Sequence, residues 1–192
     1  MADTSVSDSY IITIEDLELR LTGDPRLSAI ALKAAESTAQ TWYLQKATLA
    51  IDALPFKGQT YYEFNPNTTL DADEQDRAFP RVIDGHTHDW DEDTDGPIVP
   101  ETVKRACVEE AINLYEFYSS KSDQKREKLQ RQGVTSFSLS KLSESYQAGA
   151  ARRLKGLKSE VAYDLLKCYI AGGVEAVSFV NSYRTETPEF CR

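Results

Sequence analysis

An amphipathic segment, residues 100–118, limits the possible folds of this chain more than any other feature. Its apolar residues recur at the spacing of an α-helix and form one stripe along it. Pro100 suits the first helical position, where its missing N–H group costs nothing. The stripe comprises Val103, Ala106, Cys107, Ala111, Leu114, Tyr115 and Tyr118. This segment predicts the strongest helix of the chain and favours a mainly α fold.

Three shorter helical segments are predicted before it. The first lies within residues 10–23, where Thr13 can cap its start and Gly23 can end it. A second segment starts at Ser28, and a third runs over about residues 38–54; the pattern leaves open whether these two form one helix or two. The predicted apolar faces are Ile30, Ala31, Ala34 and Ala35 in the second, and Trp42, Leu44, Ala47, Thr48, Ile51 and Leu54 in the third.

The segments after the long helix predict a small strand pair and a last helix. Residues 134–139 and 142–146 are rich in β-formers and serine and read as two short strands. Ser159 can cap the last helix, whose predicted face carries Val161, Leu165, Leu166, Tyr169 and Ile170. The predicted fold is mainly α: a small helical bundle with a β-hairpin at about residues 133–146, a long acidic loop and an extended C-terminal arm.

Size and composition favour one domain. The chain has 192 residues, of which 41% are hydrophobic, so it can bury one substantial core. We predict one helical domain over residues 1–173, with a loop insertion at about 56–98, and a C-terminal arm over 174–192. No apolar run is long enough to span a membrane, and the polar N-terminus has no signal-peptide pattern. The three cysteines lie far apart, which predicts reduced thiols without metal or redox pairing.

Charge of opposite sign is concentrated in two windows. Residues 71–95 hold ten acids and two bases, a net charge of -8, whereas residues 121–158 hold ten bases and three acids, a net charge of +7. One interpretation is two solvated surfaces that keep the protein soluble. The other is complementary charge between neighbouring copies in an oligomer. The overall charge of -9 disfavours a general nucleic-acid binder, which needs clustered Lys and Arg to neutralise phosphates.

The best candidate for a metal site lies in the acidic loop. Asp91, Asp93 and Asp95, followed by Gly96, match the first half of a calcium-binding loop, in which hard oxygen ligands surround the ion. The second half does not match, because Thr102 stands where the loop needs a bidentate Glu. The two histidines of the chain lack the partners of a zinc site. These aspartates therefore remain a weak candidate beside a simple solvated loop.

Catalytic motifs are absent from the sequence. It contains no Gly-rich phosphate loop, no nucleophile elbow and no supported His–Cys pair. Glu109 and Glu110 on the long helix are expected at a solvated face or a subunit contact, and Cys107 is expected to be a small core residue. We predict no enzyme activity, no catalytic residue and no cofactor.

A nucleic-acid surface is the other function that the residues allow. Phe137 and Tyr146 could stack on bases, or they could instead pack inward. The basic side chains that could line such a surface are Lys125, Arg126, Lys128, Arg131, Lys141, Arg152, Arg153, Lys155 and Lys158. Because the rest of the molecule would repel phosphate, we expect these bases to face solvent or an acidic partner.

The order of the segments resembles a phage family known as DnaT-like single-stranded-DNA-binding proteins, whose members occur in head-assembly gene clusters. The matching segments are YIITIEDLELRL, LQKATLAIDAL, AFPR, VPETVKRACVEEAINLYEF, GVTSFSLSKLSESY and the short last helix. The resemblance covers about residues 10–170 and rests on order and spacing. Where the family has Trp-Pro-Arg, this chain has Phe79-Pro80-Arg81, and its tail beyond residue 172 is longer than expected.

The resemblance implies a structural virion protein, a head-to-tail adaptor of tailed bacteriophages. Such a subunit is expected to form a ring, expected to be twelvefold, beneath the portal protein, and to carry passing double-stranded DNA without specific binding. Tail, stopper or tail-terminator proteins would dock on the ring, so the expected location is the virion neck, with the host cytoplasm during assembly. The candidate interface residues are Val174, Val177, Phe179, Val180, Tyr183, Arg152, Arg153, Lys155, Asp91, Asp93 and Asp95.

Two alternatives stay open beside the adaptor. The family's label suggests a single-stranded-DNA-binding replication accessory protein. The acidic loop suggests an interaction module stabilised by calcium. A net acidic subunit suits the wall of a channel through which DNA, a polyanion, slides. Charge windows of opposite sign suit the contact between unlike faces of neighbouring subunits that a ring requires.

Overall fold

The computed structural model describes residues 9–61, 77–83, 86–87, 90–91, 96–122, 124–125, 136–139, 142–145 and 156–171. The helices of this described part are α1 (Ile14–Leu21), α2 (Leu27–Lys33), α3 (Ser37–Asp52), α5 (Glu101–Ser119) and α8 (Glu160–Leu166). The strands between them are short. The prediction of a mainly α fold is therefore confirmed.

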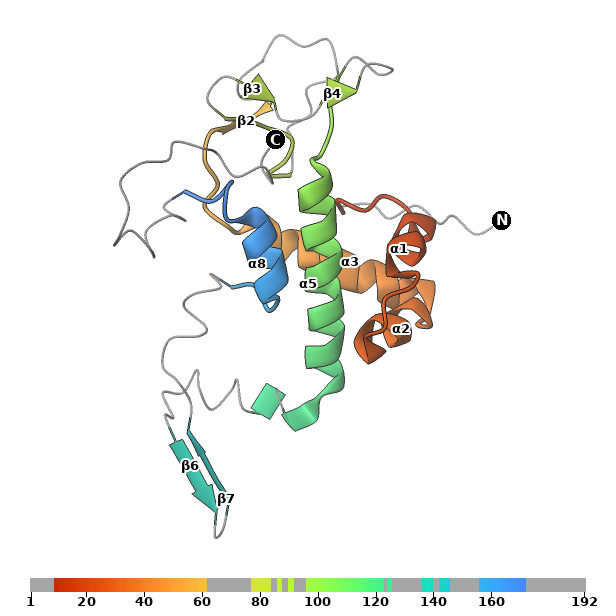
Figure 1. Cartoon of the computed structure of the whole chain (residues 1–192), viewed down its shortest axis with the longest axis vertical. Coiled ribbons are helices and arrows are strands. Elements are labelled where there is room, and N and C mark those ends of the chain that lie inside the picture. The colour runs from red at the N-terminus through yellow and green to blue at the C-terminus, as the bar shows by residue number, and fades with distance from the viewer. Residues whose placement is uncertain are drawn as a thin grey trace.

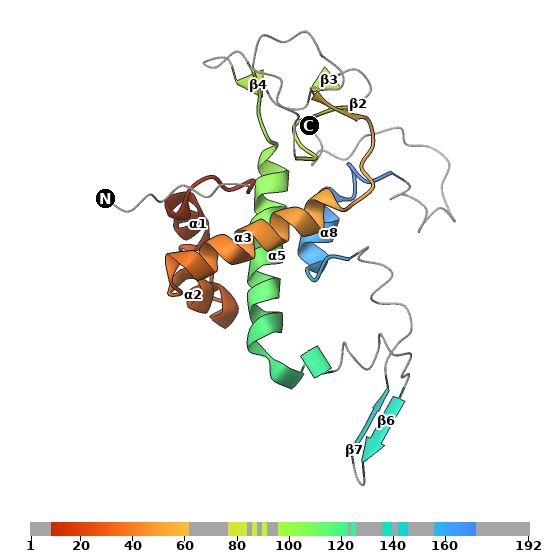
Figure 2. The same ribbon diagram turned by 180° about the vertical axis from the view of Figure 1, so that it is seen from behind.

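Helix α5 is the centre of the helical body (Figure 1). α3 crosses it on one side, while α1 with α2 and α8 lie on opposite flanks, as the reverse view also shows (Figures 1 and 2). Most of the predicted stripe is buried, but Tyr118 is 46% exposed, and Val108 and Ile112 are buried although the stripe did not include them. The buried surface of α5 is wider than one stripe because helices cover it on several sides.

The first helix has the termini that the sequence predicts. The Asp16 N–H group donates to Thr13 Oγ1 at 3.1 Å, which satisfies one of the free donors at the start of α1. Gly23 has a φ of 85°, in the left-handed region where a side chain would be strained. Residues 34–36 separate α2 from α3, so the two segments that the sequence left unresolved are two helices.

The predicted face of α2 is wrong. Ile30 is 52% exposed, whereas Ala29 and Leu32 are fully buried on the side of α2 that packs against the body. In α3 the predicted face is confirmed at Leu44, Ala47, Thr48, Ile51 and the following Leu54. Trp42 is the exception, because it lies at the surface with its ring edge-on to Tyr118 at 5.3 Å.

Helix α8 covers the flank of α5 opposite to α1 and α2. Its predicted cap is confirmed, since the Ala162 N–H group donates to Ser159 Oγ at 3.1 Å. Leu166 is buried, as are Tyr169 and Ile170 just beyond the helix, but Val161 is 51% exposed and was wrongly placed on the buried face. The predicted C-terminal arm, residues 174–192, lies outside the described residues.

A predicted strand pair is present after α5. Strands β6 (Ser136–Leu139) and β7 (Leu142–Ser145) pair antiparallel, with Leu139 opposite Leu142. Within the insertion, five very short strands form where none was predicted: β1 (Gln59–Thr60), β2 (Arg81–Ile83), β3 (His86–Thr87), β4 (Trp90–Asp91) and β5 (Gly96–Pro97). They form an antiparallel sheet in the order β1-β2-β3 and a separate β4–β5 pair. Strands of two or three residues are too short to show an alternating pattern.

The Phe79-Pro80-Arg81 motif joins this insertion to the helical body. Phe79 is 2% exposed, and its ring packs edge-on against those of Tyr10, Phe56 and Tyr169. The Phe79-Pro80 peptide bond is cis. The motif therefore has a packing role in this fold.

The cysteines differ in their state. Cys107 is free and fully buried on α5, as predicted for a small core residue. Cys168 is disulfide-bonded, so the prediction of reduced thiols throughout the chain is wrong at this position. The wide spacing of the cysteines in the sequence did not reveal this disulfide bond, because only the fold brings distant cysteines together.

Candidate functional site

Only one of the predicted interface residues, Asp91, lies among the described residues. Asp91 is in β4, where it pairs with Gly96 of β5. The remaining candidates lie outside the described residues: Val174, Val177, Phe179, Val180, Tyr183, Arg152, Arg153, Lys155, Asp93 and Asp95. Within the described part of the chain, no three His, Cys, Asp or Glu side chains are grouped as metal ligands.

Glu110 is the most unusual polar residue of the described structure. Its side chain is fully buried on α5, although the sequence predicted a solvated or subunit-contact position. The Lys158 N–H group donates to Oε1 at 2.9 Å and to Oε2 at 3.0 Å, and the Ser159 N–H group donates to Oε2 at 2.8 Å. These donors belong to the start of α8, where N–H groups have no partner within the helix. Glu110 thus binds the start of α8 to α5.

Burial raises the pKa of the Glu110 carboxyl above its ordinary value of 4.5. The two backbone N–H donors and the Lys158 ammonium act in the opposite direction and lower that pKa, but they offset only part of the effect. The ammonium itself lies 4.2 Å from the centre of the Phe117 ring, a cation–π contact. Among the described residues, both oxygens of this carboxyl accept hydrogen bonds from the start of α8.

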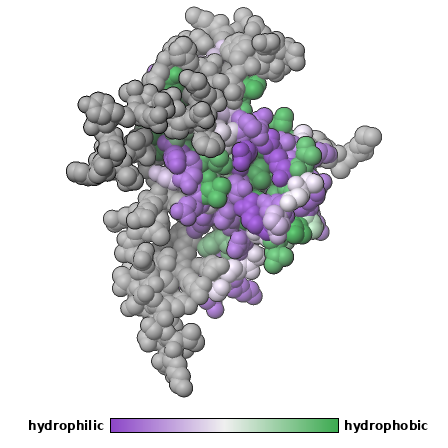
Figure 3. Space-filling model, in the orientation of Figure 1, coloured by the Kyte–Doolittle hydropathy of each residue, from purple (hydrophilic) through white to green (hydrophobic). Residues whose placement is uncertain are grey.

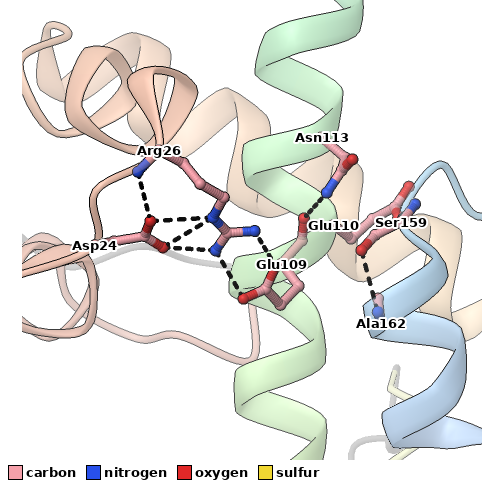
Figure 4. Close-up of polar contacts among 7 residues, drawn as sticks. All are labelled: Asp24, Arg26, Glu109, Glu110, Asn113, Ser159 and Ala162. Atoms are coloured by element: carbon pink, nitrogen blue, oxygen red, sulfur yellow. Dashed lines mark hydrogen bonds and ion pairs between the residues drawn. The ribbon is translucent and has the colours of Figure 1, made fainter.

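The neighbouring Glu109 points to the opposite flank of α5, toward α2 (Figure 4). It accepts two hydrogen bonds from the Arg26 guanidinium, at 2.6 and 2.9 Å. The same guanidinium also donates to both carboxylate oxygens of Asp24. The hydrogen bond from Arg26 lowers the pKa of Asp24. This partly exposed cluster joins the turn before α2 to the central helix.

A similar pair joins α1 to the start of α5. The Arg20 guanidinium donates to both oxygens of Glu101, and its Nε donates to Asp16 at 2.9 Å. The hydrogen bond from Arg20 lowers the pKa of Glu101. Three acids of α5, Glu101, Glu109 and Glu110, therefore serve as anchors for α1, the turn before α2 and the start of α8.

A buried polar cluster closes the base of the insertion. The Tyr10 hydroxyl donates to Asp52 Oδ1 and accepts from the Phe79 N–H group, and the Ala78 N–H group donates to the same carboxylate at 3.1 Å. Burial and the Asp52 carboxylate raise the pKa of Tyr10. The cluster therefore fixes residues 78 and 79, in the middle of the insertion, against the core.

Arg81 strengthens this closure. Its guanidinium donates to the carbonyl oxygens of Lys57, Gly58 and Ala78, at 2.9, 2.7 and 3.1 Å. The Arg of the Phe-Pro-Arg motif thus binds three backbone carbonyls from two segments of the insertion, residues 57–58 and residue 78. The sequence did not predict a role for this motif, because its partners are backbone carbonyls, which leave no signal in the sequence.

Apolar side chains are exposed on α1 and α2. The hydropathy view shows hydrophobic residues scattered among hydrophilic ones on the described surface (Figure 3). Leu27 is 84% exposed, Leu19 is 73% exposed and Ile12 is 68% exposed. An open groove of about 590 Å³ lies beside Leu27, between α2 and the end of α5. Its lining residues are Arg26, Leu27, Ser28, Ala31, Tyr115, Glu116 and Ser119.

Aromatic rings extend this surface around the end of α5. Tyr43 packs against Tyr115 and Trp42 packs against Tyr118, each pair with centroids 5.3 Å apart and rings edge-on. The Lys46 ammonium lies 5.7 Å from the centre of the Trp42 ring. Exposed apolar and aromatic side chains of this kind are typical of contact surfaces between proteins.

Described strands from the two charge windows lie at opposite ends of the helical body. Strands β2, β3 and β4, from the acidic window, lie beyond the N-terminal end of α5, and the β6–β7 hairpin, from the basic window, lies beyond its C-terminal end (Figures 1 and 2). No described helix is long and apolar enough to cross a bilayer. No protein-family model, curated protein or solved structure matches this chain.

Proposed function

We propose that this chain is a head-to-tail adaptor of a tailed bacteriophage, a structural virion protein that forms a ring beneath the portal. The ring would extend the DNA channel and give stopper or tail proteins a docking surface. The resemblance in segment order motivates this proposal, and the mainly helical fold agrees with it. The expected location is the virion neck, after assembly in the host cytoplasm.

The observation that carries the proposal is the separation of charge along the sequence. Residues 121–158 have a net charge of +7 and residues 71–95 have a net charge of -8. A ring requires one face of each subunit to meet a different face of the next. Segments of opposite charge would supply such complementary faces and favour one orientation over others.

Microscopy tests the proposal directly. Virion necks imaged by cryo-electron microscopy should contain a ring of this chain between the portal and the tail. A tagged chain should also co-purify with intact virions. A neck density into which the helical body does not fit, or virions that lack the chain, would refute an adaptor role.

The C-terminal arm, residues 174–192, has a proposed role in docking to the portal. Its apolar residues could order on a neighbouring protein during assembly. A chain truncated after residue 173 should keep the helical circular-dichroism spectrum of the full chain and fail to bind portal in a pull-down. Loss of the folded monomer on truncation would instead assign the arm to the core.

Single-stranded-DNA binding is the alternative function. The exposed Trp42 beside Lys46 favours it, because an indole ring with a cation nearby can stack on bases. An adaptor should show negligible affinity for a fluorescent single-stranded oligonucleotide at moderate salt. Tight, salt-sensitive binding that Trp42→Ala weakens, or that Arg152→Ala with Arg153→Ala abolishes, would favour the alternative. A calcium-stabilised module is tested by chelator, which should leave the melting temperature unchanged if no ion is bound.

A further inference from the structure

We propose that two copies of this chain join through unlike helices, with the outer face of α1 in one copy docking on the outer face of α3 in the next. The proposal deepens the ring proposed above and rests on it only in requiring that copies meet. Both faces lie in the described part of the chain, and both are exposed in the single molecule. The groove beside α2 has no comparable feature that identifies its occupant.

The outer face of α3 carries two apolar side chains with one cation between them. Trp42 is 40% exposed, Leu49 is 53% exposed, and Lys46 between them is exposed as well. Spacings of four and three residues place all three on one side of the helix, and the Lys46 ammonium accordingly lies 5.7 Å from the centre of the Trp42 ring. The other charged residue of α3 is Asp52, whose carboxylate accepts a hydrogen bond from the buried Tyr10. The outer face is therefore apolar with a single positive charge.

The outer face of α1 has the same composition with the opposite charge. Leu19 is 73% exposed, and Glu15, one turn before it, is exposed too. Residues four positions apart share one side of a helix, so these two side chains are neighbours. Ile12, just before the helix, is 68% exposed. Arg20, the one base of α1, already binds two other carboxylates, so this face keeps its negative charge.

The two faces match when their helices run antiparallel. Four residues separate Glu15 from Leu19. The same spacing separates Lys46 from Trp42, a rise of about 6 Å along each helix. An antiparallel alignment that places Glu15 beside Lys46 therefore also places Leu19 beside Trp42. The remaining apolar residue of each face then lies near the other, since seven residues separate the apolar pair on each face.

Within a single molecule the two faces do not meet, so a second copy is needed to join them. All of these side chains are exposed, and thus neither face covers the other in one chain. α3 crosses in front of α5 in the reverse view, while α1 lies on the flank of the body (Figure 2). Docking of α1 on the α3 of the next copy joins unlike faces, as a ring requires. Apolar burial supplies the affinity, and opposite charge favours this orientation over others.

Two single substitutions test the two faces separately. Leu19→Asp places a carboxylate on the α1 face, and Leu49→Asp places one on the α3 face. Val161→Asp is the matched control, because Val161 of α8 is 51% exposed and belongs to neither face. Sedimentation velocity of the full-length chain over a concentration series measures self-association. Each face variant should weaken association by about tenfold or more, because burial of a leucine is lost, whereas the control should stay within about threefold of wild type.

A mixture of the two face variants tests which faces meet. Leu19→Asp keeps an intact α3 face, and Leu49→Asp keeps an intact α1 face. An equimolar mixture should therefore form a dimer, and nothing larger, at concentrations where each variant alone is monomeric. A mixture that stays monomeric would overturn the proposed contact. Association of Leu19→Asp alone at the strength of wild type would also overturn it, since α3 would then not need α1 as its partner.

Exchange of the two charges tests the orientation. Lys46→Glu and Glu15→Lys should each weaken association, because each places like charges opposite one another. The double variant restores an opposite pair and should associate more tightly than either single variant. Additive losses in the double variant would overturn the antiparallel alignment.

The controls separate the possible failures. Far-UV circular dichroism should show equal helix content in all variants, since every substituted side chain is exposed. A lower melting temperature in the face variants without a change in association would assign the faces to another segment of the same chain and overturn the contact. A wild-type chain that stays monomeric at every concentration would overturn it too, while leaving the ring to the neck images. A neck without this chain would refute the ring itself.

Discussion

Removal of the Glu110 carboxylate tests the central contact of the fold. In Glu110→Ala, the N–H groups of Lys158 and Ser159 lose their acceptor. Each hydrogen bond to a charged group contributes about 1.5–3 kcal/mol, and relief of the buried charge offsets part of the loss. We therefore expect the free energy of unfolding to fall by about 2–4 kcal/mol. The melting temperature should fall by roughly 4–16 °C in a chain of this size.

Glu109→Ala is the matched control, because it removes a carboxylate from the adjacent position of the same helix. Glu109 binds Arg26, whose side chain is 40% exposed and keeps its second partner, Asp24. Loss of such a pair should cost less than about 1 kcal/mol. Urea unfolding followed by circular dichroism measures both variants.

Hydrogen exchange locates the effect. In Glu110→Ala, the amides of Lys158 and Ser159 and the first turn of α8 should exchange faster, because the contact that orders them is absent. In Glu109→Ala their exchange should match that of wild type. A loss of stability in Glu110→Ala no greater than that in Glu109→Ala would refute the role assigned to this carboxylate.

Three other predictions concern the described residues, and urea unfolding checks each. First, burial raises the pKa of Glu110, so folding favours its protonated form. The free energy of unfolding of wild type, relative to that of Glu110→Gln, should therefore rise as the pH is lowered from about 7 toward 4.5. A decrease in this relative stability would contradict the sign. Second, Gly23→Ala should cost about 1 kcal/mol from its positive φ alone. Gly58→Ala should cost ~1–3 kcal/mol more, because its Cβ would lie 2.1 Å from the Val82 carbonyl oxygen, and equal losses would contradict the close approach. Third, Tyr10→Phe should cost about 1–3 kcal/mol, since the partly buried Asp52 carboxylate loses its hydroxyl donor, and an unchanged midpoint would contradict that role.

Features set by neighbouring residues could be predicted from the sequence. The caps at Thr13 and Ser159 depend on a side-chain oxygen and an N–H group three residues later, so the local pattern sufficed. The long helix also carries enough turns to define its stripe. The seven-residue α2 does not, and the prediction therefore placed Ile30 on the apolar face and left out Ala29 and Leu32, which the structure buries.

Features set by distant partners could not be predicted. Glu110 meets the start of α8 only in the folded chain, and an acid beside Glu109 carries no sign of burial. The same holds for Tyr10 and Asp52, which are hydrogen-bonded although α1, α2 and most of α3 lie between them in the sequence. Of the candidate interface, only Asp91 lies among the described residues, so its proposed role still depends on the sequence.

The Glu110 contact has a consequence for how this protein can diverge. The chain leaves α5 after Ser119 and is bound back to the same helix at Lys158. Doubling the length of such a loop, whose two ends are fixed to one helix, costs only about 0.6 kcal/mol of chain entropy. Insertions, deletions or exchange of the hairpin should therefore be tolerated by the helical body. Variants of this chain could keep one scaffold and acquire new binding partners by changing this segment alone.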